Sequence, residues 1–184
     1  MILLREQARL FYRIWIPLLD FVNQKKEIDK SLFGMTSPEG LPISSLKPIR
    51  DALWGDRELL DEYIELKHGQ LTNEEQSVIA GWKNAICDSF VVLRHLKSGS
   101  IVLPIHNTSA AYIVRGIYSS WDEVLMGAAL PTLVTTTLIP FAGVIICDSI
   151  MIAHHMQLVG NEKRSMEELY RRIKTAGGVQ KSLG

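Results

Sequence analysis

Residues 130 to 153 read LPTLVTTTLIPFAGVIICDSIMIA, a run of 24 residues that carries a single charge, at Asp148. A run of this length either crosses a membrane or belongs to the core of a folded domain. A spanning helix needs about 20 consecutive apolar residues, but Pro140 and Gly143 interrupt this run near its centre. Proline, glycine and dense Val, Ile and Thr favour strands joined by a turn. We therefore predict a β-hairpin here and no membrane span.

Two further stretches upstream show strand-forming composition. The segment SFVVLRHLKSGSIVLPIH has Ser98-Gly99 at its middle, which predicts a hairpin with strands at 90–96 and 100–105. Residues 111–118 predict another strand, so that five strands follow one another through mostly short connections. Strands that are apolar on both faces need cover on both faces, or a sheet that curls on itself. The sequence thus predicts a five-stranded, mostly antiparallel curved sheet or small barrel.

Helical patterns precede and follow this sheet. Apolar residues recur at helical spacing over residues 1–22, and Thr72 with Glu75 forms the signature of a capping box for the next clear helix. Asn161 is placed to cap a last helix that ends near Gly177. We therefore expect an α+β fold with N-terminal helices packed on the sheet and a C-terminal helix. Residues 1–70 form the helical region and residues 71–184 the α+β domain, and we expect one structural unit overall.

The charge and cysteine content indicate the cellular compartment and the class of binding partner. The chain has 20 basic and 20 acidic residues, and this zero net charge disfavours a nucleic-acid partner without excluding one. Cys87 and Cys147 both lie in apolar stretches, which predicts buried free thiols in a reducing cytoplasm. Charged residues interrupt the N-terminal apolar stretch, so it lacks the pattern of a signal peptide. We expect a cytoplasmic protein that does not bind membranes.

The first helix also suggests how the chain assembles. Its apolar stripe contains Leu10, Phe11, Ile14, Trp15 and Leu18. The connection after it, residues 23–48, is long and loop-like, so the helix is not forced to fold back on its own core. This arrangement predicts a homodimer with the N-terminal helix in the interface. The alternative is that the helix covers the sheet of its own chain.

The residues that could carry chemistry are few and scattered. A metal site could combine Asp148 with His106, His154 or His155, but the chain has neither H-x-H nor H-E-x-x-H spacing. His68 and His95 complete the five histidines, and polar residues at strand ends are the expected role for most of them. We predict no catalytic, cofactor-binding or metal-ligating residue.

Asp148 stands alone among apolar neighbours, and an unpaired buried carboxylate is costly. Its side chain must therefore face water, pair with Arg94 or Arg115, or accept backbone hydrogen bonds. A structural role is expected ahead of a catalytic one.

Three segments together resemble a family of uncharacterised bacterial α+β proteins. They are a helix with the element Trp82-Lys83-Asn84, a strand with Tyr112, Val114 and Gly116, and a hairpin with Thr137, Ile139, Pro140, Phe141, Gly143, Ile145, Ile146, Asp148 and Met151. The resemblance covers roughly residues 71–175. It implies an α+β fold and carries no known activity or site residues.

Three classes of function follow from these observations. The first is a non-enzymatic intracellular interaction or regulatory module, favoured because no reactive cluster appears. The second is a small-barrel nucleic-acid binder that uses the basic C-terminal helix. The third is a metal-dependent hydrolase built around Asp148 and the histidines.

Overall fold

The computed structural model describes residues 1–37 and 41–184, without the side chain of His155, so Pro38 and Gly40 of the predicted connection lie outside it. The chain forms two compact units. We call Met1–Leu4 with Ala85–Gly184 the sheet unit, and Arg5–Asn84 the helical unit. The helical unit continues past residue 70, where we placed a boundary, because the helix capped by Thr72 packs with the helix before it.

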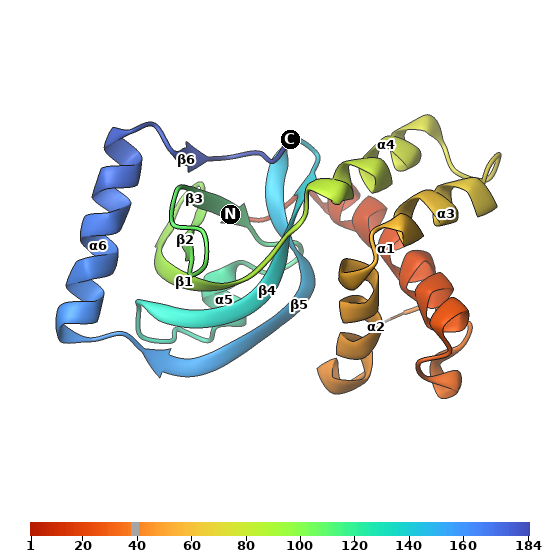
Figure 1. Ribbon diagram of the computed structural model, residues 1–184, viewed down its shortest axis with the longest axis horizontal. Helices are drawn as coiled ribbons and strands as arrows, with labels where there is room; N and C mark the ends of the chain where they lie inside the picture. Colours follow the sequence, from red (N-terminus) through yellow and green to blue (C-terminus); the bar gives the residue numbers. More distant parts are fainter. Residues whose placement is uncertain (38–40) are drawn as a thin grey trace. The chain divides into compact units, whose positions relative to one another are not determined.

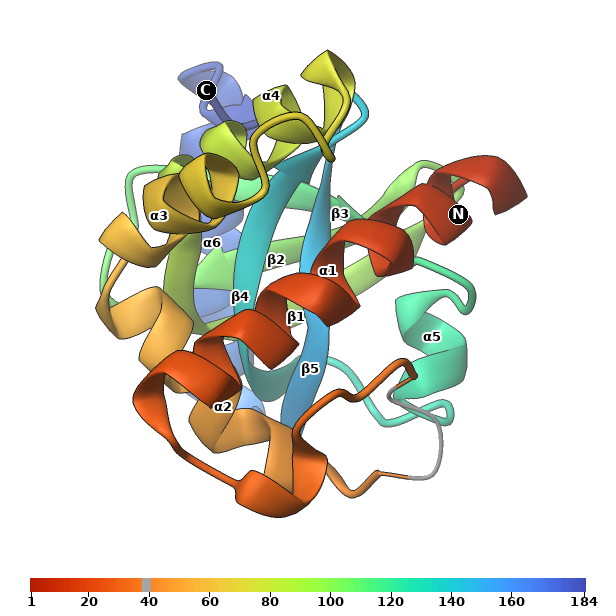
Figure 2. The same cartoon turned by 90° about the vertical axis from the view of Figure 1, so that its right-hand side faces the viewer.

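The helical unit consists of four α-helices with two short 3₁₀ turns among its described residues. They are α1 (Arg5–Lys26), η1 (Lys30–Leu32), α2 (Ile43–Gly55), α3 (Glu58–Leu66), α4 (Asn73–Gly81) and η2 (Trp82–Asn84). Contacts link α1 with α2 and α3, and α3 with α4 (Figure 2). The capping box is confirmed, because Glu75 N donates to Thr72 Oγ1 at 3.2 Å and Thr72 N donates to a Glu75 carboxylate oxygen at 2.9 Å.

Aromatic rings form the centre of the helical unit. Trp15 lies 5.8 Å from Phe11, 5.8 Å from Trp54 and 5.6 Å from Trp82, measured between ring centroids. Phe11, Trp15 and Trp82 are almost completely buried. Phe11 and Trp15, which belong to the α1 stripe on which we based the homodimer, therefore pack inside their own unit. The homodimer itself stays a prediction, and this stripe does not support it.

The sheet unit contains six strands, and hydrogen bonding between five of them runs in a closed ring. The elements are β1 (Ile86–Leu96), β2 (Gly99–Pro104), β3 (Ala111–Arg115), α5 (Trp121–Val124), β4 (Thr132–Phe141), β5 (Val144–Gln157), α6 (Gly160–Thr175) and β6 (Val179–Gln180). The pairing order is β2-β1-β4-β5-β3-β6, and β2 also pairs with β3 (Figure 1). A one-residue bridge at Ile2 adds a seventh paired segment. The α+β class is confirmed.

The prediction of five mostly antiparallel strands is wrong, because the sheet is mixed and larger. β3 runs parallel to both β5 and β6. The chain passes through α5 and the strand β4 before β5 pairs with β3, and it passes through α6 before β6 pairs with β3. These partners are not joined to β3 by a short turn, and only a short turn makes consecutive strands antiparallel neighbours.

The hairpin predicted within residues 130–153 is confirmed as β4 and β5. Its turn has Ala142 at φ 49° and Gly143 at φ 74°, the left-handed pair that suits a two-residue hairpin loop. Residues that point to one face of the hairpin, including Val134 and Leu138 of β4 and Ile145 of β5, pack into one apolar cluster with β1, β2 and β3. No helix among the described residues is long and apolar enough to span a bilayer.

The helix α6 packs on the opposite side of the strands. Tyr170 and Ile173 join a second apolar cluster with Val91 and Ile101. Asn161 does not cap this helix, because α6 begins at Gly160 and its N-cap, Val159, makes no side-chain cap. The predicted cap is therefore wrong.

The first residues of the chain belong to the sheet unit and not to α1. Leu3 N donates to Gly116 O at 2.9 Å, and Gly116 N donates to Met1 O at 3.1 Å. Ile2 and Gly116 form a parallel bridge. The helix predicted from residue 1 therefore begins at Arg5, because the first four residues find backbone partners beyond the end of β3.

Gly116→Ala is expected to lower the free energy of unfolding by about 1–3 kcal/mol, the usual cost of forcing extra atoms into a packed site. A Cβ at Gly116 would lie 1.9 Å from the carbonyl oxygen of Ser119, so backbone would have to move. Urea unfolding measures the effect. Gly55→Ala is the control, because a Cβ there meets nothing within 4 Å. Equal midpoints for the two variants would contradict this account.

Candidate functional site

Asp148 lies at an irregularity of β5. Its side chain is fully buried, and its Oδ1 accepts a hydrogen bond from Ile150 N at 3.2 Å. Ser149 between them has φ 71°, a left-handed conformation that is uncommon for serine. The register between β4 and β5 shifts at this point. The pattern is that of a β-bulge, in which extra residues on one strand bend it.

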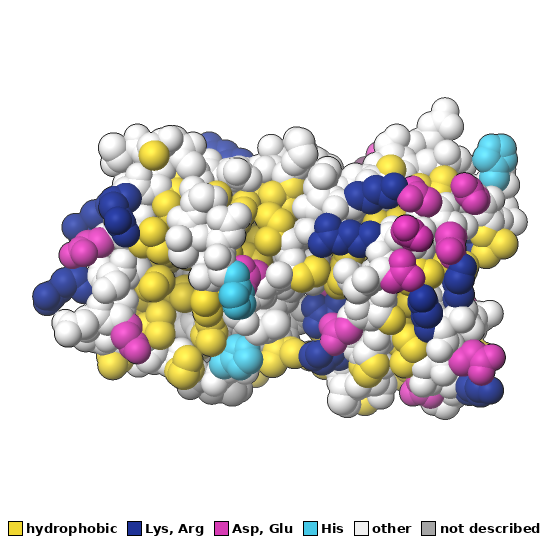
Figure 3. All heavy atoms as spheres, viewed as in Figure 1, with side chains coloured by type: hydrophobic (Ala, Val, Ile, Leu, Met, Phe, Trp, Pro, Cys, Tyr) yellow, Lys and Arg dark blue, Asp and Glu magenta, His cyan; other side chains and the backbone are white. Residues whose placement is uncertain are grey.

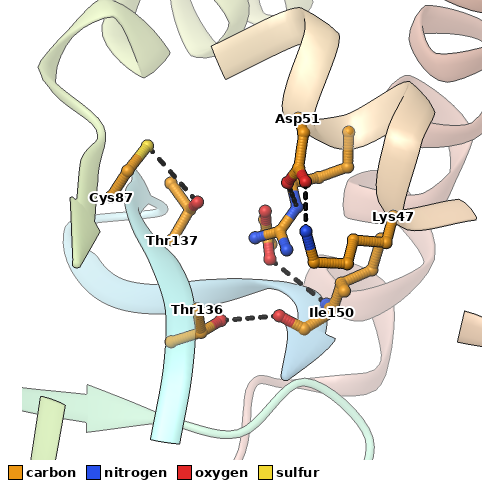
Figure 4. A network of polar contacts seen from close by, with 8 residues as sticks. Lys47, Asp51, Cys87, Thr136, Thr137 and Ile150 are labelled. Atoms are coloured by element: carbon orange, nitrogen blue, oxygen red, sulfur yellow. Dashed lines mark hydrogen bonds and ion pairs between the residues drawn. The ribbon is translucent and has the colours of Figure 1, made fainter. Parts of the chain in front are cut away.

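Thr136 on β4 completes this local arrangement. Its hydroxyl donates to Ile150 O at 2.7 Å, and Figure 4 shows the two residues facing each other across the strands. Of the alternatives for Asp148, acceptance of a backbone hydrogen bond is confirmed and exposure to water is wrong. Arg94 forms an ion pair with Glu167 and lies over the Tyr170 ring. Pairing of Asp148 with Arg115 stays a prediction.

The two cysteines differ in their surroundings. Burial, together with a smaller contribution from the charge of Asp148, raises the pKa of Cys147 to about 12. A thiol with such a pKa is protonated at neutral pH and is a poor nucleophile. Cys87 is exposed at the start of β1, where the Thr137 hydroxyl donates to its sulfur at 3.4 Å (Figure 4). Both thiols are free as predicted, but the expected burial is wrong for Cys87.

The histidines contact different partners and do not gather. His106 Nδ1 lies 2.5 Å from a carboxylate oxygen of Asp88, and His154 Nε2 lies 2.7 Å from Thr135 Oγ1. His68 is exposed in the helical unit. Within residues 1–37 and 41–184, no three His, Cys, Asp or Glu side chains are placed to hold a metal ion. The side chain of His155 lies outside this description.

His95 takes part in a polar series that the sequence analysis missed. Its Nδ1 lies 2.8 Å from Ser100 Oγ, and its Nε2 lies 3.6 Å from an oxygen of Asp122. The residue types match a nucleophile, a base and an acid. Burial lowers the pKa of His95, and the charge of Asp122 opposes this effect.

This series does not form a working nucleophile. Ser100 is only 4% exposed and lies within β2, so a substrate carbonyl has no approach to its hydroxyl. The contact of His95 with Asp122 is longer than a hydrogen bond. His95 and Ser100 are cross-strand partners in the β1–β2 hairpin. Their hydrogen bond therefore stabilises the hairpin, and the hairpin pattern in the sequence is the signal that could have identified the pair.

Exposed apolar side chains form the most distinctive surface of the sheet unit. Met126 is 90% exposed, Val159 60%, Met156 51% and Val124 47%. We call these four residues the apolar edge. Sequence analysis missed it, because isolated apolar residues in turns and at strand ends follow no helical or strand period.

Hydrogen bonds join the end of β5 to the segment that follows α5. The loop after α5 leads into Pro131 and Thr132, where β4 begins. Leu158 N donates to Pro131 O at 2.9 Å, and the Thr132 hydroxyl donates to Met156 O at 3.2 Å. The end of β5 is thus fixed beside the segment that follows α5.

Met126 has an unusual backbone conformation for so large a residue. Its φ is 50°, in the left-handed region where non-glycine residues are uncommon. The turn directs an apolar side chain into water when a polar residue would fit there as well. Strained residues of this kind cluster at functional sites.

Charged residues lie next to the residues of the apolar edge in the sequence. Asp122 and Glu123 lie in α5, and a backbone hydrogen bond from Ser120 lowers the pKa of Glu123. Lys163 and Arg164 lie in the first turns of α6. Figure 3 shows one face of the sheet unit, with apolar side chains over the strands and Lys and Arg on α6.

Comparison of the chain with protein-family models, with curated proteins and with solved structures finds no match.

Proposed function

We propose that the chain is a non-enzymatic intracellular interaction module that binds a partner protein through the apolar edge. The observation that carries this proposal is Met126, which is 90% exposed on a left-handed backbone. Exposed apolar groups rimmed by charge are typical of protein-binding surfaces. Methionine in particular adapts its shape to a partner.

The polar groups support a binding role over an enzymatic one. Asp148 accepts a backbone hydrogen bond, and His95 forms a hydrogen bond across the β1–β2 hairpin. The side chains of His106 and His154 form hydrogen bonds with one neighbouring side chain each. Each of these contacts has a structural purpose. The same contacts favour a rigid scaffold beneath the apolar edge, which limits the entropy lost on binding.

A photo-crosslinking amino acid at position 126 tests the proposal. In the cells that encode the chain, irradiation of the full chain with the probe at 126 is expected to give covalent adducts of defined mass. The physical reason is that the side chain at this position would be buried in the complex. Denaturing electrophoresis and mass spectrometry identify each adduct.

Leu66 provides the matched control, since it is apolar and 62% exposed but belongs to the helical unit. The probe at position 66 should give no comparable adduct. The same adducts in the same yield from both positions would show non-specific capture and overturn the proposal. Absence of any adduct at 126 would overturn it as well.

A nucleic-acid binder is the second candidate, favoured by the charge of the C-terminal segment. Residues 160–184 contain six basic and three acidic side chains, although the whole chain is neutral. Arg171, Arg172 and Lys174 are exposed near the end of α6. A gel-shift titration against salt distinguishes this candidate, because phosphate contacts weaken steeply as salt rises.

A metal-dependent hydrolase around Asp148 and the histidines is the remaining alternative. Elemental analysis of the purified chain tests it directly. The cytoplasmic compartment and the resemblance to uncharacterised bacterial proteins stay as proposals that accompany the interaction module.

A further inference from the structure

We infer that the helical unit binds a small organic cation, an amine with an apolar body, in a pocket beside α1. The pocket has a volume of about 470 Å³, which is within the range of small-molecule sites in proteins. One face of α1 forms one wall, and residues 34–36, which follow η1, form the other. The lining residues all belong to the helical unit, so the inference is independent of the apolar edge and of the proposed function.

The helical period places the α1 wall on one face. Arg13, Ile16, Pro17 and Asp20 stand at positions i, i+3, i+4 and i+7 of the helix. Pro17 has no N–H, so the carbonyl oxygen of Arg13 lacks the hydrogen bond that a regular helix supplies at this point. A backbone acceptor and the Asp20 carboxylate therefore lie on the same face of α1, with Ile16 beside them.

Hydrogen bonds hold the second wall in place before any ligand binds. Gly34 N donates to Asp20 Oδ1 at 2.7 Å, so the chain after α1 turns back beside the helix (Figure 2). The buried side chain of Asn23 donates to Asp29 O at 2.9 Å and accepts from Asp29 N at 2.8 Å. A pocket whose walls are already fixed loses little entropy on binding.

The charges of the lining select a cation. Arg13 and Asp20 are the charged residues that line the pocket. The Arg13 guanidinium is paired, because its Nε and Nη2 both lie 3.0 Å from Glu75 Oε1. Among the described residues, the Asp20 carboxylate accepts hydrogen bonds from uncharged donors only, Gly34 N and the side-chain amide of Gln24. The unbalanced charge is therefore that of Asp20, and an ammonium group is its complement.

Apolar side chains form the rest of the pocket. Tyr12 and Ile16 on α1 and Met35 on the second wall are partly buried. The Tyr12 ring provides a face that attracts a cation, and the flexible Met35 adapts to the shape of a ligand. The pocket therefore suits an amine with an aromatic or aliphatic body better than a fully polar cation.

Titration of the full chain with phenethylamine, followed by heteronuclear NMR of the backbone amides, tests the inference. We expect the Gly34 and Met35 signals to shift and saturate, with a dissociation constant of about 1 mM or lower. Hydrocinnamate, an anion of similar size and shape, should bind at least about tenfold more weakly, because the Asp20 carboxylate repels it.

Asp20→Asn removes the charge and keeps an oxygen that can accept from Gly34 N. It should weaken phenethylamine binding at least about tenfold, since a hydrogen bond between charged groups becomes one to a neutral amide. Glu65→Gln, which removes an exposed carboxylate of α3 outside the pocket, is the matched control and should have no effect. Ile16→Trp fills the pocket without changing its charge and should also abolish binding. Thermal unfolding checks that each variant folds.

Three results would overturn the inference. They are Gly34 and Met35 signals that do not saturate, equal affinity for phenethylamine and hydrocinnamate, and an Asp20→Asn variant that binds as tightly as the unchanged chain. If Asp20→Asn does not fold, Ile16→Trp decides, and undiminished binding by that variant would contradict the pocket. Photo-crosslinking at position 126 is a separate measurement, so failure here leaves the proposed function untouched.

Discussion

Asp148→Ala is expected to lower the free energy of unfolding by about 1–3 kcal/mol, the cost of leaving a buried hydrogen-bond donor unsatisfied. The carboxylate is fully buried and accepts the backbone hydrogen bond of Ile150, so its loss leaves a buried donor unsatisfied. It also removes the group that fixes the left-handed Ser149 within β5. Urea denaturation of the purified full chain measures the change.

Glu162→Ala is the matched control for this prediction. Glu162 is an exposed carboxylate at the start of α6, and exposed charge interactions are worth about 1 kcal/mol or less. Asp148→Asn separates charge from shape, because the amide oxygen can still accept from Ile150 N. Equal urea midpoints for Asp148→Ala and Glu162→Ala would show that the bulge does not depend on the carboxylate.

Trp15→Ala is expected to cost about 3–5 kcal/mol of stability, the usual range for removing a buried tryptophan. The ring of Trp15 contacts those of Phe11, Trp54 and Trp82, so the change leaves a cavity where α1 meets α2 and the end of α4. Helical circular dichroism followed through thermal unfolding detects the loss.

The oligomeric state distinguishes this account from our first expectation for α1. If the apolar stripe were an interface, Trp15→Ala would dissociate a dimer and leave the monomer folded. We expect the reverse, which is a less stable helical unit and an unchanged oligomeric state. Leu66→Ala, at an exposed position in the same unit, should change neither property. A dissociated but equally stable variant would contradict our description.

Local sequence patterns predicted the local structure well. The two hairpins followed from strand composition and turn residues. The capping box of Thr72 with Glu75 is present. In each case the deciding interaction joins residues close in the chain, so a short window of sequence contains all the information.

Long-range pairing accounts for most of what the sequence did not predict. The parallel pairing of β3 with β5 and β6 joins segments separated by one or more helices or strands. Met1–Leu4 continue the apolar pattern of α1, so no periodic signal separates their backbone bridge to Gly116 from a helical turn. Loop exposure at Met126 depends on which surfaces neighbouring elements already cover. A short window of the sequence does not contain the information that decides any of these features.

The attachment of Leu3 to Gly116 also sets an order of events during synthesis. The ribosome adds about 5–20 residues each second, so Leu3 waits roughly 6–23 s before its partner is made. All residues of the helical unit emerge consecutively within that interval. The helical unit can therefore complete its aromatic core first, while the sheet unit still lacks most of its strands. Met1–Leu4 lack their partner in the nascent chain until the sequence after β3 has been made.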